Sequence, residues 1–392
     1  MITVRQIARS LLDPAAYRRI TSGGGFVPEV DGIRFVAIAA VILLHLNTHF
    51  KRTVTGVDVS GYIGSPIDGI LGQGATGVEI FFALSGFILA LPFCRAHTGK
   101  GPRVGIGRYY LRRLTRLEPP FILSTLVIFF LLVITGIVAA SEAMPHLLAT
   151  LTYTHSIIFG AWSTINPVTW SLETEVQFYI IAPLLALVFV IRDARMRAVG
   201  VLMLWFLAIQ LPTPDRLTPY NLQYSLISYL HVFLIGFFFC ELYVHHPWVL
   251  QGRHRLFDLI GIATLLGVFA FGADNRGFFD VMLLVFMISV FRSVTVNRVL
   301  TNRWVTAVGG ACYSLYLLHY AVIFMVMTVT GRVVLPWLPA TWLLQFGISL
   351  VAVLVIGMLF FRWCERPFMR PTWPAEARDS MRRSMQRVRA IG

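Results

Sequence analysis

Residues 31–49 read DGIRFVAIAAVILLHLNTH, and this stretch decides the fold. It is apolar over the length of a membrane span, but Arg34 lies near its start and His45 lies deep within it. In a helix, eleven steps of about 100° bring His45 to within about 20° of the face of Arg34, about 16 Å further along the axis. A titratable side chain inside a membrane is costly unless it faces a protein interior or a wet cavity. The stretch therefore predicts a transmembrane helix with one functional face.

The composition excludes an ordinary soluble protein. Hydrophobic residues make up 57% of the 392 residues and charged residues only 13%, and the mean hydropathy is +0.72. Soluble domains of this length do not combine so much apolar sequence with so little charge. We therefore predict an all-α fold, a polytopic transmembrane helical bundle.

The cysteines indicate neither a disulfide framework nor a zinc site, so no metal is predicted. They lie in or beside apolar segments and show no CxxC spacing. The four are Cys94, Cys240, Cys312 and Cys364. His231 and Glu241, in a later apolar stretch, are interpreted as satisfied structural groups.

About ten segments are long enough to cross a hydrocarbon core of about 30 Å. They lie at roughly 33–50, 74–93, 118–139, 174–191, 197–212, 224–244, 256–273, 277–292, 311–331 and 339–361. Residues 1–30 contain no long apolar core, so they are predicted to be a basic leader and not a cleavable signal peptide. Residues 31–366 form the membrane domain, and residues 367–392 form a basic tail that is either a membrane-surface helix or disordered.

The positive charges orient this bundle. An even number of spans returns both termini to one side, and 27 of the 33 Lys and Arg residues fall on that side. The opposite side holds only Lys51, Arg52, Arg216, Arg276 and Arg332. Because Lys and Arg accumulate in cytoplasmic loops, both termini are predicted to be cytosolic and His45 lies in the outer half of the membrane. Topology and anionic lipid account for the net charge of +14, so no nucleic-acid partner is predicted.

Carboxylates enter two of the other spans. Glu79 precedes Ser85 and Gly86 in GVEIFFALSGFIL, and it is either an interfacial carboxylate or a group that faces the His45 cavity. The stretch TWSLETEVQFYIIAP places Glu173 and Glu175 near a helix start, after Trp170. Carboxylates there can simply offset the helix dipole, but with Gln177 nearby they favour a polar cavity. Residues 140–173 before this span are expected to be irregular backbone that lines a cavity from the outer side.

The most basic loop ends in RRLTRLEPPF and runs into the third span. Arg112 and Arg116 are four residues apart, so on a helix their guanidinium groups share a face, and Arg113 lies beside them. Guanidinium forks suit phosphate oxygens. The loop is therefore either an anchor for lipid headgroups or the binding site for a phosphate-rich cytosolic ligand.

The ninth span carries polar side chains in YSLYLLHY. Tyr316, His319 and Tyr320 fall within about one turn of one another and present a polar stripe to the bundle. Tyr313 and Ser314 begin the same span.

Together these motifs resemble those of the membrane acyltransferase 3 family. DGIR with His45 eleven residues after Arg34, GVEIFFALSGFIL, RRLTRLEPPF, TWSLETEVQFYIIAP, YSLYLLHY and a closing ERPF occur in the family order, over roughly residues 30–370. The resemblance implies about ten core helices and transfer of an acyl group, commonly acetyl from acetyl-CoA, to hydroxyls of extracytoplasmic carbohydrates. Some relatives carry an additional hydrolase-like domain, and this chain is expected to stop too soon for one.

The resemblance also implies roles for individual residues. His45 and Arg34 are the essential pair, and Glu175 is a better candidate than Glu173, which stands where the family varies. Arg112, Arg113, Arg116 and Arg34 are expected to bind acyl-CoA, and Glu79, Trp170, Tyr313, Ser314 and His319 to line the acceptor site.

These assignments give a hypothesis for the mechanism. Acyl-CoA binds from the cytosol, and neutral His45 removes the proton of an acceptor hydroxyl as it attacks the thioester. Glu175 or Glu79 is expected to orient the imidazole, as in a catalytic triad. Arg34 is three turns away on a straight helix, so it is expected to hold the CoA arm or Asp31. A covalent acyl intermediate on His45 or Ser314 is an open alternative.

The competing class is a transporter or flippase of sugar-lipid substrates, which would use the same intramembrane charges as a pathway. The two halves of the chain share no motif that would indicate the internal repeat of many transporters. We therefore expect an acyl-CoA:carbohydrate O-acyltransferase, located as a multi-pass protein in the bacterial inner membrane with the lipid bilayer, acyl-CoA and a carbohydrate acceptor as partners. The acceptor, an exopolysaccharide or another glycan, is left open by the sequence.

Overall fold

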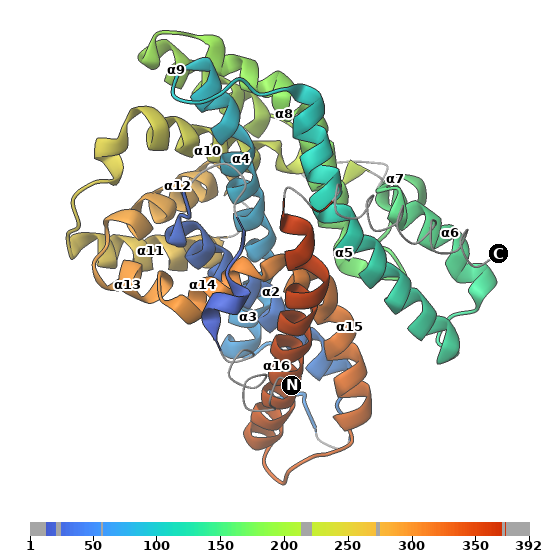
Figure 1. Ribbon diagram of the computed structural model, residues 1–392. Helices are drawn as coiled ribbons and strands as arrows, with labels where there is room; N and C mark the ends of the chain where they lie inside the picture. Colours follow the sequence, from blue (N-terminus) through green and yellow to red (C-terminus); the bar gives the residue numbers. More distant parts are fainter. Residues whose placement is uncertain are drawn as a thin grey trace, which may run out of the picture.

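The computed structural model describes residues 13–20, 25–55, 58–212, 222–271, 275–370 and 373. All regular elements in this part of the chain are helices, which confirms the all-α prediction (Figure 1). Most of the predicted leader, Arg216 and the predicted tail beyond residue 373 lie outside the described residues.

Each of the ten predicted stretches coincides with a helix. These are α2 (Pro28–Thr53), α4 (Thr76–His97), α5 (Ile106–Ile134), α8 (Trp170–Leu185), α9 (Ala194–Ile209), α10 (Leu226–His245), α11 (Leu256–Phe271), α12 (Arg276–Arg292), α15 (Cys312–Thr330) and α16 (Leu338–Phe360). Within the described residues, six helical segments are long and apolar enough to cross a membrane. The number of ten spans and the cytosolic side of the termini stay predictions.

The prediction of irregular backbone over residues 140–173 was largely wrong. Two helices occupy half of this region, α6 (Ala140–Leu151) and α7 (His155–Phe159), and a 3₁₀ turn and the start of α8 occupy its end. Short helices that the sequence did not indicate are α3 (Pro66–Gly72), α13 (Thr295–Leu300), α14 (Arg303–Gly310), the π-helix η9 (Phe361–Glu365) and the 3₁₀ turns η1 (Pro14–Tyr17), η2 (Gln73–Ala75), η3 (Pro167–Thr169), η4 (Ala186–Val190), η7 (Pro247–Leu250) and η10 (Arg366–Met369).

Helix α2 lies at the centre of the bundle and packs against α4, α14 and α15 (Figure 1). Its start is set by Pro28 at the first helical position, where the missing N–H costs nothing. Acidic Glu29 and Asp31 occupy its first turn, and basic Lys51 and Arg52 its last, so both helix ends are complemented in charge. Because of these charged residues at both ends, the sequence of α2 is not purely apolar, although much of the helix is buried.

Two glycines fix the crossing of α4 and α10. A Cβ added to Gly86 would lie 2.0 Å from the carbonyl oxygen of Phe233, and one added to Gly236 would lie 2.0 Å from that of Ala83. Each glycine therefore admits the backbone of the other helix, as small residues do at membrane helix interfaces. Phe87 and Phe233 are almost fully buried beside this crossing. The position of Ser85, which precedes Gly86 on α4, is thus fixed by direct backbone contact between α4 and α10.

The outer surface of the bundle is apolar. Large hydrophobic side chains are exposed on several long helices, with Ile134 and Val329 each 79% exposed and Leu343 62% exposed. Apolar surface this extensive does not face water in a soluble monomer. Together with the six apolar helices, it indicates a membrane protein.

Candidate active site

A cavity of about 120 Å³ opens between α2, α4, α5, α8 and α15. Phe81, Phe82, Leu84 and Ile88 of α4 form much of its apolar wall. Its polar side chains are Arg19, Arg34, Ser85, Arg113, Arg116, Ser171, Glu175, Tyr179, Tyr313, Tyr316 and Glu365. Four of these are arginines, which makes the cavity a strongly basic site inside an apolar protein.

Asp31 orients the arginine of the first helix. The Arg34 Nη1 donates to Asp31 Oδ1 over 2.9 Å, so the side chain reaches the cavity and not His45. Arg19 lies 3.8 Å from the same carboxylate oxygen. Burial and the nearby Arg34 charge lower the pKa of Arg19 to about 9. The positive charges are therefore crowded together with incomplete neutralisation.

Helix α5 brings two of its three expected donor-site arginines to the cavity. Arg113 and Arg116, three residues apart, line the cavity, whereas Arg112 is exposed. The Arg113 guanidinium lies 5.7 Å from the centre of the Tyr179 ring. The Nε atom of Arg116 is buried and has no hydrogen-bond partner within the described residues. The spacing argument was right that α5 presents two guanidinium groups, but the phase of the helix selects Arg113.

Glu175 and Glu173 face different surroundings. Glu175 lines the cavity, accepts a hydrogen bond from Ser85 of α4, and is hydrogen-bonded by the Tyr179 side chain. Glu173 is buried and accepts a hydrogen bond of 2.9 Å from the backbone N–H of Ser156. Glu173 therefore ties α7 to α8, while Glu175 belongs to the cavity.

His45 forms a pair with His319 of α15. His45 Nδ1 lies 2.9 Å from the Val41 carbonyl oxygen and 3.1 Å from His319 Nε2. His319 Nδ1 lies 2.7 Å from the carbonyl oxygen of Tyr316 and 3.2 Å from that of Leu315. The ring centroids of the two histidines are 4.9 Å apart.

These contacts assign the tautomers of both rings. Because a carbonyl oxygen only accepts, the Nδ1 of His319 carries its proton, which leaves His319 Nε2 as an acceptor. The Nδ1–H of His45 then donates to His319 Nε2 and to the Val41 carbonyl. The Nε2 of His45 is then unprotonated and carries a lone pair, the form that a general base requires.

Tyr316 connects the histidine pair to the cavity. It lines the cavity, and its ring centroid lies 5.5 Å from that of His319. Its hydroxyl donates to the Val168 carbonyl over 3.0 Å and also bonds to Ser171. His45 itself is not among the residues that line the cavity, so the basic site and the histidine pair are neighbours joined through α15.

Neither carboxylate that was expected to orient His45 does so. Glu175 is engaged by Ser85 and Tyr179, and the charged neighbours of Glu79 are Asp280 and Arg276. Within the described residues, the only side chain that hydrogen-bonds to His45 is His319. The side chain hydrogen-bonded to His45 is thus a second histidine and not a carboxylate.

The other expected acceptor residues are divided between the cavity and its surroundings. Tyr313 lines the cavity, and its hydroxyl donates to the Leu117 carbonyl over 3.0 Å. Ser314 is fully buried behind it and donates to Glu365 over 2.5 Å. Trp170 packs against the rings of Tyr224 and Tyr229 outside the cavity lining.

Sequence reasoning missed Arg19 and Glu365, which line the cavity, and did not consider His49, which lies near the histidine pair. Arg19 had no signal because it lies before the first span. Glu365 lies in the ERPF motif, which gave a usable signal. His49 follows His45 by one helical turn, and its ring lies 4.8 Å from that of Tyr320. Its i, i+4 spacing from His45 could have identified it.

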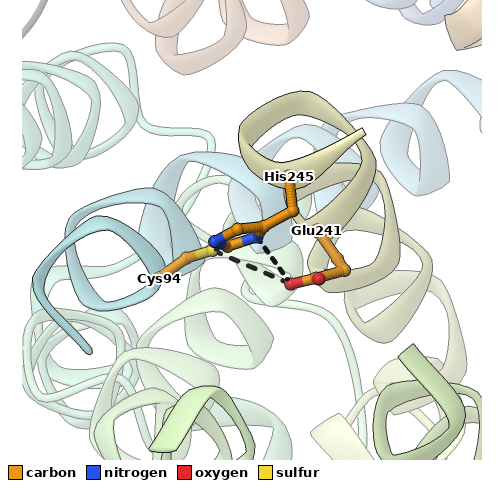
Figure 2. Close-up of side chains that lie close together, drawn as sticks. All are labelled: Cys94, Glu241 and His245. Carbon is orange, nitrogen blue, oxygen red and sulfur yellow. Dashed lines mark hydrogen bonds and ion pairs between the residues drawn. The ribbon is translucent and has the colours of Figure 1, made fainter. Parts of the chain in front are cut away.

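A separate cluster lies where α4 and α10 end (Figure 2). Cys94 Sγ lies 3.7 Å from His245 Nδ1, which is 3.0 Å from Glu241 Oε2. These are potential metal ligands, but Arg197 donates to both Glu241 oxygens, over 2.8 and 2.7 Å. Because the guanidinium already neutralises the carboxylate, we interpret the cluster as a buried ion pair that joins α9 to α10.

Comparison with known protein families identifies the domain that contains this site. Residues 27–362 match the family model of the acyltransferase 3 type, described as an acyltransferase domain. The chain belongs to the acyltransferase 3 family. This confirms the resemblance, and the matched residues include the histidine pair and most of the cavity.

Curated relatives of this acyltransferase 3 domain include bacterial O-acetyltransferases. The peptidoglycan O-acetyltransferase OatA of Listeria monocytogenes is 24% identical over 88% of the chain, and 56% of that relative is covered. The O-acetyltransferase OatA of Staphylococcus aureus is 22% identical over 90% of the chain, and 58% of it is covered. The chain thus spans a little more than half the length of these relatives. No solved structure matches it.

Proposed function

We propose that this protein is a membrane O-acyltransferase that moves an acyl group, acetyl in the first instance, from cytosolic acetyl-CoA to a carbohydrate hydroxyl on the other side of the membrane. The observation that carries the proposal is the His45–His319 pair, with one free imidazole lone pair, beside a cavity that holds four arginines. We place the protein in the bacterial inner membrane. The names of the O-acetyltransferase relatives support the acetyl group and the carbohydrate acceptor.

The arginines suit the donor. Arg113 and Arg116 lie near the start of α5, at the end of the bundle that the positive charges assign to the cytosol. Guanidinium groups bind phosphate oxygens with paired hydrogen bonds. The cavity is too small for a whole acyl-CoA, so we assign it to the thioester arm, with the phosphates at the arginines.

The histidine pair suits the chemistry. The acceptor hydroxyl attacks the thioester carbonyl while His45 Nε2 takes its proton, and the C–S bond then breaks. His319 holds the imidazole through Nδ1 and stabilises the cation that forms, which is the role of the third group in a catalytic triad. The imidazolium returns the proton to the CoA thiolate, so the step balances as hydroxyl plus thioester giving ester plus thiol.

A covalent intermediate on Ser314 is less well supported. Its hydroxyl is fully buried and donates to Glu365, and it does not line the cavity. We therefore propose direct transfer.

Replacing His319 is expected to slow the chemical step. In His319→Ala, the His45 Nδ1–H keeps the Val41 carbonyl as an acceptor, but the imidazole loses the only side chain in the described part of the structure that orients it. We expect kcat to fall by about 10–100-fold, the range found when groups that orient a functional histidine are removed. The KM for acetyl-CoA is expected to stay unchanged because His319 lies outside the cavity lining. Steady-state assays of the purified variant measure both. An unchanged kcat would remove His319 from the mechanism.

The function itself is tested by CoA release from acetyl-CoA by the wild-type protein in nanodiscs, with a panel of oligosaccharides and polysaccharides as acceptors. The proposal expects release that depends on the acceptor and an equal amount of acetyl ester on the glycan. Binding and transport of a sugar-lipid without any ester formation would instead favour a transporter or flippase.

A further inference from the structure

We propose that Arg19, which lies before the first span and outside the matched domain, is a phosphate-binding residue of the donor site. The inference rests on the proposed function and extends the donor site beyond residues 27–362. It assigns to the segment before α2 a share in binding the anionic part of acyl-CoA.

The segment that carries Arg19 is docked against the bundle. Asp13 caps the turn η1 by accepting a hydrogen bond of 3.0 Å from the Ala15 N–H. Tyr17 is 4% exposed and packs in a small apolar cluster with residues of α14, η9 and η10. Gly310 at the end of α14 lies against Arg19, since a Cβ added there would be 3.6 Å from the Arg19 Cβ. The backbone therefore holds the Arg19 side chain at the cavity.

The contacts of Arg19 neutralise its charge only in part. Its nearest carboxylate, Asp31, is 3.8 Å away and is already bonded to Arg34 over 2.9 Å. The Nε of Arg19 is buried and has no hydrogen-bond partner within the described residues. A buried donor without a partner costs about 1–3 kcal/mol. An oxyanion in the cavity would remove that cost.

The charges around the cavity indicate an anionic ligand. Arginines contribute four positive charges, and the nearby carboxylates are Asp31, Glu175 and Glu365. Glu365 interacts electrostatically with both Arg116 and Arg19. The net charge of these groups is positive even with all three carboxylates ionised. The buried Nε of Arg116, like that of Arg19, has no hydrogen-bond partner within the described residues. Two such donors from separate segments suit the oxygens of a phosphate group.

The neighbouring residue provides a matched control. Arg18 is exposed, lies over the ring of Phe26 with its Cζ 3.9 Å from the centroid, and does not line the cavity. Arg18→Gln therefore removes the same charge from the same segment without touching the proposed contact. Arg19→Lys keeps the positive charge but loses the planar guanidinium that can donate two parallel hydrogen bonds to a phosphate.

The experiment compares two donors on each purified full-length variant in nanodiscs: acetyl-CoA, and acetyl-pantetheine, which lacks phosphate. The proposal expects Arg19→Gln to raise the Kd of acetyl-CoA about tenfold or more, consistent with hydrogen bonds to a charged group. The Kd of acetyl-pantetheine is expected to stay the same, Arg19→Lys to be intermediate, and Arg18→Gln to match the wild type. The ratio of the two Kd values comes from one sample, so it does not depend on the folded fraction.

Two results would overturn the inference alone. One is an unchanged Kd for acetyl-CoA in Arg19→Gln, and the other is equal weakening of both donors, which would mean that Arg19 only positions Asp31. A wild-type protein that binds neither donor would instead overturn the proposed function.

Discussion

Replacement of His45 by alanine is expected to lower acceptor-dependent CoA release by about 10²–10⁴-fold, the usual contribution of a general base. The variant loses the imidazole nitrogen that is proposed to accept the proton. The orientation of His319 is fixed because its Nδ1 donates to backbone carbonyls. The Kd of acetyl-CoA is expected to be unchanged, since His45 does not line the cavity. Turnover assays and equilibrium binding on the same preparation check both expectations.

A matched histidine separates this effect from a general loss of structure. His97 is exposed at the end of α4, so His97→Ala is expected to retain wild-type turnover. If His45→Ala released CoA at the wild-type rate, His45 would not be the base. If it lost acetyl-CoA binding as well, its role would be structural.

Replacement of Arg197 is expected to be the most destabilising of these changes. Arg197 is 2% exposed and bonds to both oxygens of Glu241, which is fully buried. Arg197→Met leaves that carboxylate without its cation, and breaking a buried pair from one side costs about 3–5 kcal/mol. Denaturant or thermal unfolding in detergent measures the loss.

Two further variants test the interpretation of this cluster. Arg195→Met, an exposed position on the same helix, is expected to leave stability unchanged. The double variant Arg197→Met/Glu241→Leu removes both charges and is expected to recover most of the loss, because replacing a buried pair by apolar residues is often neutral. A double variant as unstable as the single one would contradict the ion-pair interpretation.

The long helices were predictable from the sequence because each coincides with a mostly apolar stretch, and six of them lie in segments long and apolar enough to cross a membrane. The shorter ones were not. α14 and α13 are brief, and they carry polar side chains such as Arg303 and Asn297 that hydropathy reads as loop. Pro145 inside α6 and Gly160 directly after α7 resemble helix breaks. Short helices of this kind are stabilised by packing against neighbours, which a local pattern does not record.

Features of the site that depend on spacing along one helix were predictable from the sequence. Features that depend on how a second helix is rotated against the first were not. Spacing alone predicted that Arg34 and His45 share one face of α2, but only Arg34 lines the cavity, and His45 pairs with His319 beside it. Whether Glu175 turns toward His45 or toward Ser85 depends on how α8 packs on α4, and the structure selects Ser85. The absence of Arg112 from the cavity lining has the same origin, because the rotation of α5 about its axis follows from its tertiary contacts.

The tautomer of His45 has a consequence for the balance of protons across the membrane. With Nδ1–H donated to His319 and Val41, Nε2 is the position that receives the acceptor's proton. In the proposed reaction that proton leaves on the thiol of CoA, which departs to the cytosol. The acceptor's proton is thus exchanged for the acetyl group between a neutral hydroxyl and a neutral thiol. No free proton is consumed or released on either side, so turnover in sealed vesicles would not depend on the pH gradient.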